Sequence, residues 1–413
     1  MFRALASDNF PPFGKLNLQF PVVESKPADL AEVHLFTGVN GTGKTRLLTV
    51  LAAMLGGTEA LARRLKGPGT TTFRVSEKIP TPGHPNPSWL AFDANPHGIH
   101  WQMLTPFAQW CQTVPAFAYH GTAYVKDEKI AAMGGTPNPQ RPTCLAFSRP
   151  ADYSKTLLQA IANLTVQAGM ESRRSDATKG RSIQIVQALE DAISGITQQR
   201  FAFFVTGYQE PKLLVRWGSS ELFFDVLPDG LRAIIGWMVD ATVMLDAWLQ
   251  GKGDLRETEA VFLLDEPESH LHPVWQRRVL PAFQRLFPKA QIFVATHSPF
   301  VISSLNHGWI HRLSLEHDGQ VAVAEPAPAS LGDSYIYVLE EIMGLPEWYD
   351  PETEELLARF RALRDDAFHG NDDARAKAFE LGQSLAGRSD ELRFMMGKEL
   401  SQMERRLGKA EAK

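Results

Sequence analysis

The sequence has very few cysteines, and they form no metal-binding pattern. The 413 residues include only two, Cys111 and Cys144, and neither belongs to a C-x-x-C pair. This spacing argues against a structural zinc site or a zinc hook, and low cysteine use is typical of proteins in a reducing cytosol. We therefore expect a cytoplasmic protein.

Long apolar runs are also lacking. The most apolar predicted helix, near Leu231 to Leu249, is interrupted by Asp240 and Asp246, whereas a membrane span needs about 20 predominantly apolar residues. No apolar stretch with a cleavage site is visible at the N-terminus, so we expect neither a signal peptide nor a membrane partner. Charge is nearly balanced, with 42 basic and 47 acidic residues, and this total does not indicate a polyanionic partner.

A glycine-rich stretch between a predicted strand and a predicted helix is the strongest signal. Gly38 to Thr45 reads Gly-Val-Asn-Gly-Thr-Gly-Lys-Thr and satisfies the pattern G-x-x-x-x-G-K-[ST]. The apolar run Val33 to Phe36 precedes it, and apolar residues recur at helical spacing from Arg46 to Leu55. Such a turn directs backbone N–H groups and the positive end of a helix dipole at one point, which suits polyphosphate. A chance glycine turn is the alternative, and the flanking elements disfavour it.

This P-loop predicts ATP and Mg²⁺ as ligands. We expect Lys44 to reach the β- and γ-phosphates and Thr45 to offer its hydroxyl to Mg²⁺. The predicted ATP-binding residues are Gly38, Asn40, Gly41, Gly43, Lys44 and Thr45.

A pair of acidic residues follows a buried strand. Ala260 to Leu264 is a continuous apolar run, typical of a central parallel strand covered on both faces, and it ends in Asp265-Glu266. Beside a P-loop, the first carboxylate can hold Mg²⁺ together with Thr45, and the second can polarise the attacking water. Acidic pairs at strand ends are common on their own, but here Pro267 to Pro273 and a predicted helix follow directly.

The next predicted strand, Gln291 to Thr296, leads into His297. Ligands of open α/β sheets bind outside the carboxyl ends of strands, so the polar residues at these ends should meet. The residues expected to converge are Lys44, Asp265, Glu266 and His297. A histidine after a strand is usually a satisfied turn residue, but the order of the motifs favours a γ-phosphate contact here.

In the N-terminal half, Phe2 to Phe20 predicts a hairpin of two strands. Gly56 to Pro115 predicts loops and short strands, because glycine, proline and tryptophan are scattered through it. The strand Ala116 to Tyr119 runs into His120 to Tyr124, which either approaches a ligand or forms a turn; a turn is favoured.

Further along the chain, Asp152 to Gln198 predicts two helices joined by a polar loop at Glu171 to Arg181. Leu227-Pro228-Asp229-Gly230 precedes a further helix, whose N-terminus could face phosphate. Leu331 to Lys413 predicts an almost wholly helical segment, within which Asn371-Asp372-Asp373 is expected to cap a helix.

Taken in order, these motifs resemble the ABC-type ATPase heads of the SMC, RecF and OLD group. Within it, the chain is similar to the stand-alone AAA family ATPases of prokaryotic defence islands, such as the ATPase subunit of Septu and of retron-linked systems. The resemblance covers Phe2 to about Ser304 and, more loosely, the helical tail. It is carried by Gly38 to Thr45, Leu227 to Gly230, Asp265 to Pro267, His270 to Arg277, Phe287 to Gln291 and Thr296 to Pro299.

The resemblance implies an α/β fold of the P-loop NTPase class. It is an ABC-ATPase head with a mixed, largely parallel sheet, an inserted helical arm and a helical C-terminal region. The expected division is 1–150 for the N-terminal lobe with the P-loop, 151–200 for the arm, 201–325 for the C-terminal lobe and 326–413 for the helical region.

The resemblance also implies a mechanism. Such heads dimerise head to tail, with ATP buried between the P-loop of one subunit and the signature element of the other. The implied roles are phosphate and Mg²⁺ binding for Lys44 and Thr45, metal support for Asp265, general base for Glu266, switch histidine for His297, and closure of the partner's site for Asp229 and Gly230.

Two departures from the family pattern bear on hydrolysis. Pro228 stands where the common signature has serine, so no hydroxyl reaches the γ-phosphate from there, and Arg232 or the backbone from Gly230 onward must serve instead. The usual Q-loop glutamine is not identifiable; Tyr119 to Thr122 is only a positional candidate.

Three functions remain open. The leading one is an ATP-hydrolysing switch whose dimer closes on ATP, in a defence or DNA-related complex. The second is a slow or non-hydrolysing scaffold that restrains a separate effector such as an HNH nuclease. A transporter subunit is disfavoured, because inserted segments lengthen the gap from Thr45 to Asp265.

Direct DNA binding also stays open. The basic clusters of the sequence are Arg173-Arg174, Lys179 to Arg181 and Arg277-Arg278, and such clusters are more often solvated faces.

Overall fold

The computed structural model forms two compact units, Met1–Val338 and Leu339–Lys413. It describes residues 1–8, 10–23, 26–56, 71–76, 89–95, 98–101, 106–122, 126, 128–131, 138–148, 153–173, 180–207, 211–329, 332, 334–345 and 347–410.

A seven-stranded mixed sheet is the centre of the first unit. Its order is β14-β13-β3-β12-β11-β7, with β15 paired to β13. The parallel strands are β7 (Ala116–His120), β11 (Val261–Asp265), β12 (Gln291–Ala295), β3 (Glu32–Gly38) and β13 (Trp309–Leu315). Strands β14 (Val321–Val323) and β15 (Ala327–Pro328) pair with β13 in antiparallel fashion. Strands β11 and β12 are buried along their whole length, and apart from Asp265 and Gln291 their residues are apolar, as expected for central parallel strands.

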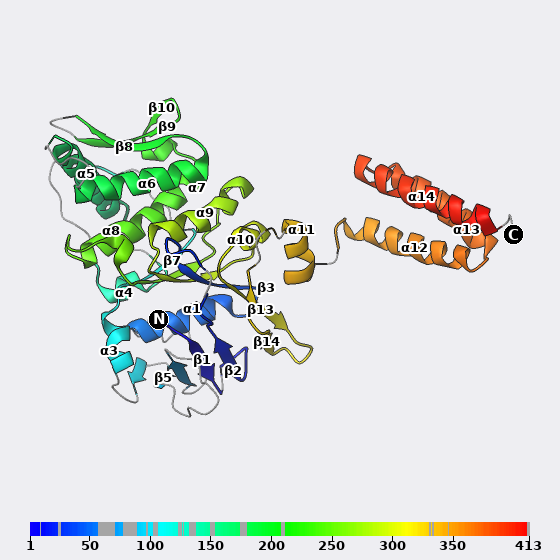
Figure 1. Cartoon of the computed structure of the whole chain (residues 1–413), viewed down its shortest axis with the longest axis horizontal. Coiled ribbons are helices and arrows are strands. Elements are labelled where there is room, and N and C mark those ends of the chain that lie inside the picture. Colours follow the sequence, from blue (N-terminus) through cyan, green and yellow to red (C-terminus); the bar gives the residue numbers. More distant parts are fainter. Residues whose placement is uncertain are drawn as a thin grey trace. The chain divides into compact units, whose positions relative to one another are not determined.

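A second sheet is antiparallel and has the order β2-β1-β4-β5-β6. Its strands are β1 (Ala4–Ser7), β2 (Leu16–Gln19), β4 (Thr71–Ser76), β5 (Trp89–Asn95) and β6 (Gly98–Trp101). The predicted hairpin of β1 and β2 is confirmed. Helix α1 (Lys44–Gly56) lies between the two sheets, and one apolar core joins its buried face to Phe73 and Phe293 (Figure 1).

The segment from Gly56 to Pro115 contains the predicted short strands but also a helix that the sequence did not predict, α3 (Pro106–Thr113). Residues 57–70, 77–88, 96–97 and 102–105 of this segment lie outside the described part. A short helix, α4 (Arg141–Cys144), follows β7.

The predicted helical pair is confirmed as α5 (Tyr153–Glu171) and α6 (Arg181–Thr197). These helices pack on each other, and α6 also packs on α9 (Pro273–Leu286). The three helices are layered beside a small sheet of β8 (Phe201–Thr206), β9 (Lys212–Trp217) and β10 (Ser220–Leu222) (Figure 1). The predicted polar loop between α5 and α6 lies mostly outside the described residues.

The helix predicted after Gly230 is broken by a π-helical turn. It consists of α7 (Asp229–Ile234), the turn Ile235–Val239 and α8 (Asp240–Trp248), and it is buried for most of its length. Further short helices of this unit are the 3-10 segments Phe224–Val226 and Leu255–Glu257, α10 (Pro299–Ser304) and α11 (Tyr335–Tyr337). Helix α11 is followed directly by a second π-helical turn, Val338–Ile342. None of the described helices is long and apolar enough to cross a membrane.

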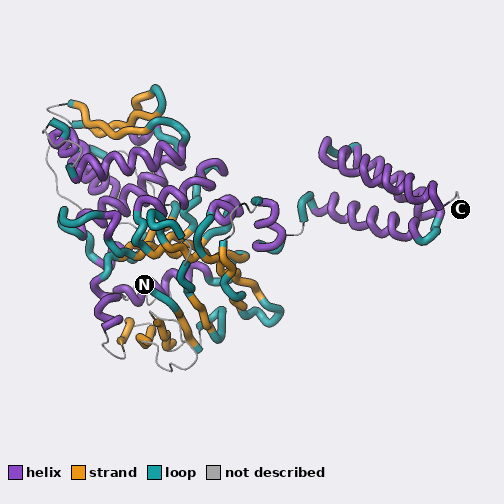
Figure 2. Tube along the Cα trace, viewed as in Figure 1, coloured by secondary structure: helices purple, strands orange, loops and turns teal. Residues whose placement is uncertain are grey.

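The second unit is helical, as predicted (Figure 2). It contains α12 (Pro351–Phe368), α13 (Asp372–Ala386) and α14 (Asp390–Ala410), which share an apolar core around Phe360 and Leu385. Asn371 is the N-cap of α13, because its Oδ1 accepts a hydrogen bond of 3.1 Å from the N–H of Ala374. This confirms the predicted cap.

A buried polar network joins the amino ends of the central strands to the N-terminal strand. Glu32 accepts hydrogen bonds from Arg3, from His34 Nε2 at 3.0 Å and from Gln291 Nε2 at 2.7 Å. Gln291 Nε2 also donates to the carbonyl of Phe2, and Gln291 Oε1 accepts from its N–H. Burial alone would raise the pKa of Glu32, but the hydrogen bonds from His34 and Arg3 outweigh this and lower the pKa to about 2.

We predict that Glu32→Gln is less stable than the wild type at pH 7, by on the order of 3 kcal/mol, the free energy that corresponds to the lowered pKa. Because the folded pKa is depressed, this stabilisation is present above the unfolded pKa of about 4.5 and is lost as the pH falls toward about 2. Urea unfolding at pH 7 and pH 3 measures it. The difference between the proteins should shrink at pH 3, and the exposed Glu316→Gln should match the wild type at both values. An unchanged difference would contradict the role of the network.

Candidate nucleotide site

The P-loop connects β3 to α1 at the carboxyl edge of the central sheet. Gly38, Gly41 and Gly43 have φ values of +152°, +88° and +86°, a region that favours glycine. A Cβ at Gly43 would lie 2.8 Å from Phe13 Cζ and 3.3 Å from Pro12 Cδ. Any larger residue at this position would therefore clash with the Phe13 ring unless the ring or the loop moved. A Cβ at Gly41 would meet open space. The loop is therefore shaped by backbone conformation, and its outer side is open to a ligand.

The ammonium group of Lys44 lies inside this loop. Its Nζ donates to the carbonyl of Gly38 at 2.7 Å and to that of Val39 at 3.0 Å. Burial lowers the pKa of Lys44 to about 8, against the opposing attraction of Glu266, Asp265 and Glu268. A negatively charged phosphate here would stabilise the charged form of the lysine.

Thr45 and Asp265 are in direct contact although 220 positions separate them in the sequence. Thr45 Oγ1 donates to Asp265 Oδ1 at 2.9 Å. Burial raises the pKa of Asp265, and the hydrogen bond from Thr45 opposes the rise. Asp265 Oδ2 also lies 4.0 Å from His120 Nε2 at the end of β7. The structure thus brings together the two residues predicted to support Mg²⁺.

Glu266 and His297 face each other at the same edge. Their Oε1 and Nε2 atoms are 3.8 Å apart, and both side chains are partly exposed. Glu266 adopts a left-handed conformation with φ of +49°, and its N–H donates to the carbonyl of Ala295 at 2.8 Å. Burial lowers the pKa of His297, and the positive charge of Lys44 lowers it further. His297 is therefore favoured as a neutral ring at neutral pH.

Gly121 permits the close approach of β7 to the turn after β11. An ideal Cβ there would lie 1.9 Å from the carbonyl oxygen of Glu266, and the N–H of Gly121 donates to the carbonyl of Asp265 at 2.9 Å. The segment after β7 was predicted to approach a ligand or to form a turn. Its described part, His120 to Thr122, forms a turn whose histidine lies beside Asp265; Ala123 and Tyr124 lie outside the described residues.

Glu268 is a buried carboxyl that the sequence analysis did not single out. Its Oε1 accepts hydrogen bonds from the hydroxyl of Thr296 and, at 3.2 Å, from the N–H of His297. Thr296 Oγ1 in turn accepts from the N–H of Ser298 at 2.9 Å. Burial raises the pKa of Glu268 to about 7, which these hydrogen bonds only partly oppose. Glu268 therefore ties the turn after β11 to the segment that carries His297.

The segment around Asp229 and Gly230 begins α7 beside the same turn. Asp229 pairs with Arg232, and a Cβ at Gly230 would lie 2.8 Å from the carbonyl oxygen of His270. Pro228 is the N-cap residue and makes no side-chain cap. Closure of a partner's site by Asp229 and Gly230 stays a prediction.

The described residues contain no group of three or more His, Cys, Asp and Glu side chains that could hold a metal ion. Thr45 and Asp265 alone would fill only a minority of the coordination positions of a Mg²⁺ ion, so other oxygen ligands would have to fill the rest. This is the usual situation for a Mg²⁺ ion that binds with a nucleotide, because phosphate oxygens and water fill those positions. The pair therefore fits a metal that arrives with triphosphate better than a metal bound by the protein alone.

Comparison with known sequences supports this interpretation. A family model described as "AAA domain, putative AbiEii toxin, Type IV TA system" matches residues 241–303, which include Asp265, Glu266 and His297. Septu protein PtuA from Bacillus thuringiensis is 25% identical over 159 residues, which cover 37% of this chain and 40% of that protein. The Retron Vc95 probable ATPase from Vibrio cholerae serotype O1 biovar El Tor is 29% identical over 189 residues, covering 44% and 36%. The Retron Ec83 probable ATPase from Escherichia coli is 26% identical over 263 residues, covering 62% and 45%.

The chain matches less than half of the length of each of these curated relatives. Among solved structures, the SMC head domain from Thermotoga maritima is similar with a TM-score of 0.42 and 14% identity, covering 78% of this chain and 98% of that one. The recombination mediator protein RecF has a TM-score of 0.39, 12% identity and coverages of 78% and 98%. At these scores the structural likeness is weak, and the fold assignment rests on the strand order and the motifs. On those grounds the chain has an α/β P-loop fold, and its sequence matches make it similar to ABC-type ATPases of prokaryotic defence systems.

Proposed function

We propose that the chain binds ATP with Mg²⁺ and hydrolyses it to ADP and phosphate. The observation that carries the proposal is the contact between Thr45 and Asp265, which brings the P-loop to the acidic end of β11. Lys44 and the backbone of Gly38 to Gly43 would bind the phosphates. Bound Mg²⁺ would neutralise charge on the β- and γ-phosphates, held by Thr45 and Asp265.

In this proposal, Glu266 is the general base and His297 contacts the γ-phosphate. Glu266 is partly exposed and lies close enough to Lys44 to attract its charge, so its carboxylate can accept a proton from a water molecule that attacks the γ-phosphate. His297 lies 3.8 Å from that carboxylate and is favoured as a neutral ring, which can donate one hydrogen bond without adding charge. Glu266 would therefore take the proton of the attacking water, while His297 would donate a hydrogen bond to the γ-phosphate.

We further propose that the chain works as a nucleotide-dependent homodimer in a defence system, with Asp229 and Gly230 of one copy closing the site of the other. The names of the similar Septu and retron proteins support this setting. An effector such as an HNH nuclease is the kind of partner that such a switch would control.

A second function, a nucleotide-binding scaffold that hydrolyses ATP slowly or not at all, is favoured by one observation. Pro228 offers no hydroxyl at the start of α7, so Arg232 or the backbone from Gly230 onward would have to contact the γ-phosphate instead. Nucleotide binding would persist in such a protein, because the P-loop does not depend on this residue.

The two functions differ in the effect of Glu266→Gln. We predict that this variant still binds ATP but releases phosphate at least about 100-fold more slowly, because a positioned base contributes roughly 10²- to 10⁴-fold. Phosphate release and nucleotide binding are measured on the same samples. Lys44→Ala should lose nucleotide binding, and Glu259→Gln, an exposed acid of the same lobe, should behave as wild type. A wild type that binds ATP but is no faster than Glu266→Gln would favour the scaffold.

If the chain forms a nucleotide-dependent dimer, its molecular mass in solution should double when ATP binds. In Glu266→Gln, which should retain ATP, light scattering after size exclusion should give twice the monomer mass with ATP and Mg²⁺, and the monomer mass without them. Asp229→Ala in the same background should weaken the dimer. A single mass under all conditions would contradict a nucleotide-dependent dimer.

Glu268 is predicted to position His297. Glu268→Gln keeps the oxygen that accepts hydrogen bonds from Thr296 and His297, so its rate of hydrolysis should stay within about threefold of wild type. Glu268→Leu removes that oxygen, and its rate should fall at least about tenfold. Because the pKa of Glu268 is higher in the folded protein than in the unfolded chain, the wild type loses stability as the pH rises from the unfolded pKa of about 4.5 through the folded pKa of about 7. Between pH 6 and 8.5 the melting temperature of Glu268→Gln should therefore rise relative to wild type. Equal hydrolysis by both variants would contradict the positioning role.

A further inference from the structure

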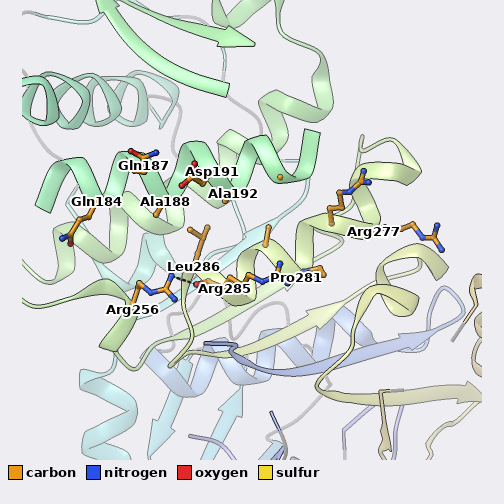
Figure 3. A pocket seen from close by; sticks show the side chains of 13 residues that line it. Gln184, Gln187, Ala188, Asp191, Ala192, Arg256, Arg277, Pro281, Arg285 and Leu286 are labelled. Atoms are coloured by element: carbon orange, nitrogen blue, oxygen red, sulfur yellow. Dashed lines mark hydrogen bonds between the residues drawn. The ribbon is translucent and has the colours of Figure 1, made fainter. Parts of the chain in front are cut away.

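A basic groove lies outside the nucleotide site, between α6 and α9 (Figure 3). It has a volume of about 680 Å³, and its walls are the two helices together with the 3-10 segment Leu255–Glu257. Four arginines line it: Arg256, Arg277, Arg278 and Arg285. Asp191 is the acidic residue of the lining. The groove therefore has an excess of positive charge, although the chain as a whole has a formal net charge of −5.

The arginines of this groove have no acidic partner among the described residues. Arg256 Nη1 donates to the carbonyl of Arg285 at 3.0 Å, and Arg278 Nη1 to the carbonyl of Val274 at 3.4 Å. Each guanidinium carries five N–H donors, so most of these donors are left for a ligand. By contrast, Arg181 in the adjoining pocket is already paired with Asp246 at 2.6 Å.

Besides its polar side chains, the lining contains small apolar residues, which we call the floor of the groove. On α6, Ala188, Ala192 and Gly195 lie at positions i, i+4 and i+7, which share one face of the helix. The facing part of α9 contributes Pro281 and Ala282. Because these side chains are short, another helix can approach closely, with its apolar face on the floor.

We propose that this groove binds an acidic amphipathic helix of a partner protein. Arg277 or Arg278 is separated from Arg285 by seven or eight residues of α9, about 10–12 Å at 1.5 Å per residue. Carboxylates two turns apart on a docked helix have the same spacing, and arginine pairs with a carboxylate through two N–H donors. The apolar face of such a helix would cover the alanine floor, which is the helix-in-groove mode of recognition.

A nucleic acid fits the groove less well. Sites for single strands stack the bases on aromatic side chains, and the lining contains none. A phosphate backbone would also pair with the arginines alone and leave the small apolar side chains of the groove without an apolar partner. Arg277 and Arg278, whose role the sequence left between a solvated face and DNA binding, are therefore assigned to a protein partner.

The groove is connected to the candidate nucleotide site through α9. Gln276 accepts a hydrogen bond of 2.6 Å from Ser298 Oγ, next to His297, and donates from Nε2 to the carbonyl of Leu271. Arg277 follows directly and lines the groove. A bound helix therefore contacts the element that holds the segment of His297. The docking proposal does not depend on hydrolysis, since it is measured by binding alone.

The test uses the full chain and a fluorescein-labelled peptide of about 18 residues, built from Glu, Ala and Leu with leucine every third or fourth position. We expect saturable binding by fluorescence anisotropy, with none for the matching peptide that has Lys in place of Glu. The double variant Arg277→Gln/Arg285→Gln should raise the Kd at least tenfold, and Ala192→Trp, which fills the floor without changing charge, should do the same. The control Arg359→Gln/Arg361→Gln, two exposed arginines of α12, should bind within twofold of wild type.

Two results would overturn the proposal. One is an acidic peptide that does not bind, or that binds the groove variants as it binds the wild type while their melting temperatures match. The other is a labelled DNA oligonucleotide of about 20 bases that binds more tightly than the peptide and loses affinity in the same arginine variant. That second outcome would assign the groove to nucleic acid.

Discussion

The parallel order of four central strands is the constraint on which the candidate site depends. In the register of the sheet, His120, Asp265, Ala295 and Phe36 are neighbours across β7, β11, β12 and β3. Strands β7, β11 and β12 end at this row and β3 ends two residues later, at Gly38, so the next residues of four distant segments emerge at one edge. The hydrogen bond from Thr45 to Asp265 is the direct consequence. Without this register, the P-loop and the acidic strand end would be two unrelated motifs.

The same edge gathers opposite charges in a partly buried place. Burial lowers the pKa of Lys44 to about 8 and raises that of Glu268 to about 7, while Asp265 is raised as well. Each charged form is therefore less favourable than in water, and a ligand that brings both phosphate and a divalent cation relieves both signs at once. This electrostatic balance explains why nucleotide and metal are expected to bind together.

The sequence predicted much of the fold because its strands are buried on both faces and its glycine motif has one structural solution. The apolar run Ala260 to Leu264 and the helical periodicities of α5 and α6 therefore predicted the observed elements. Helix α3 was missed because its segment is rich in turn-forming residues, and its helical character depends on packing. Glu268 was missed because only the fold brings it to Thr296. The arginine groove was also beyond reach, since its two walls come from separate segments.

We propose that the residues converging at this edge bind a triphosphate with its metal, and α9 reaches from this edge to the groove. The proposal is tested most directly by titrating the purified full chain with ATP in an isothermal calorimeter, with Mg²⁺ and with excess EDTA. We expect saturable binding of about one ATP per chain that is tighter with Mg²⁺, and loss of the Mg²⁺ effect in Asp265→Asn. No uptake of ATP under either condition would contradict it.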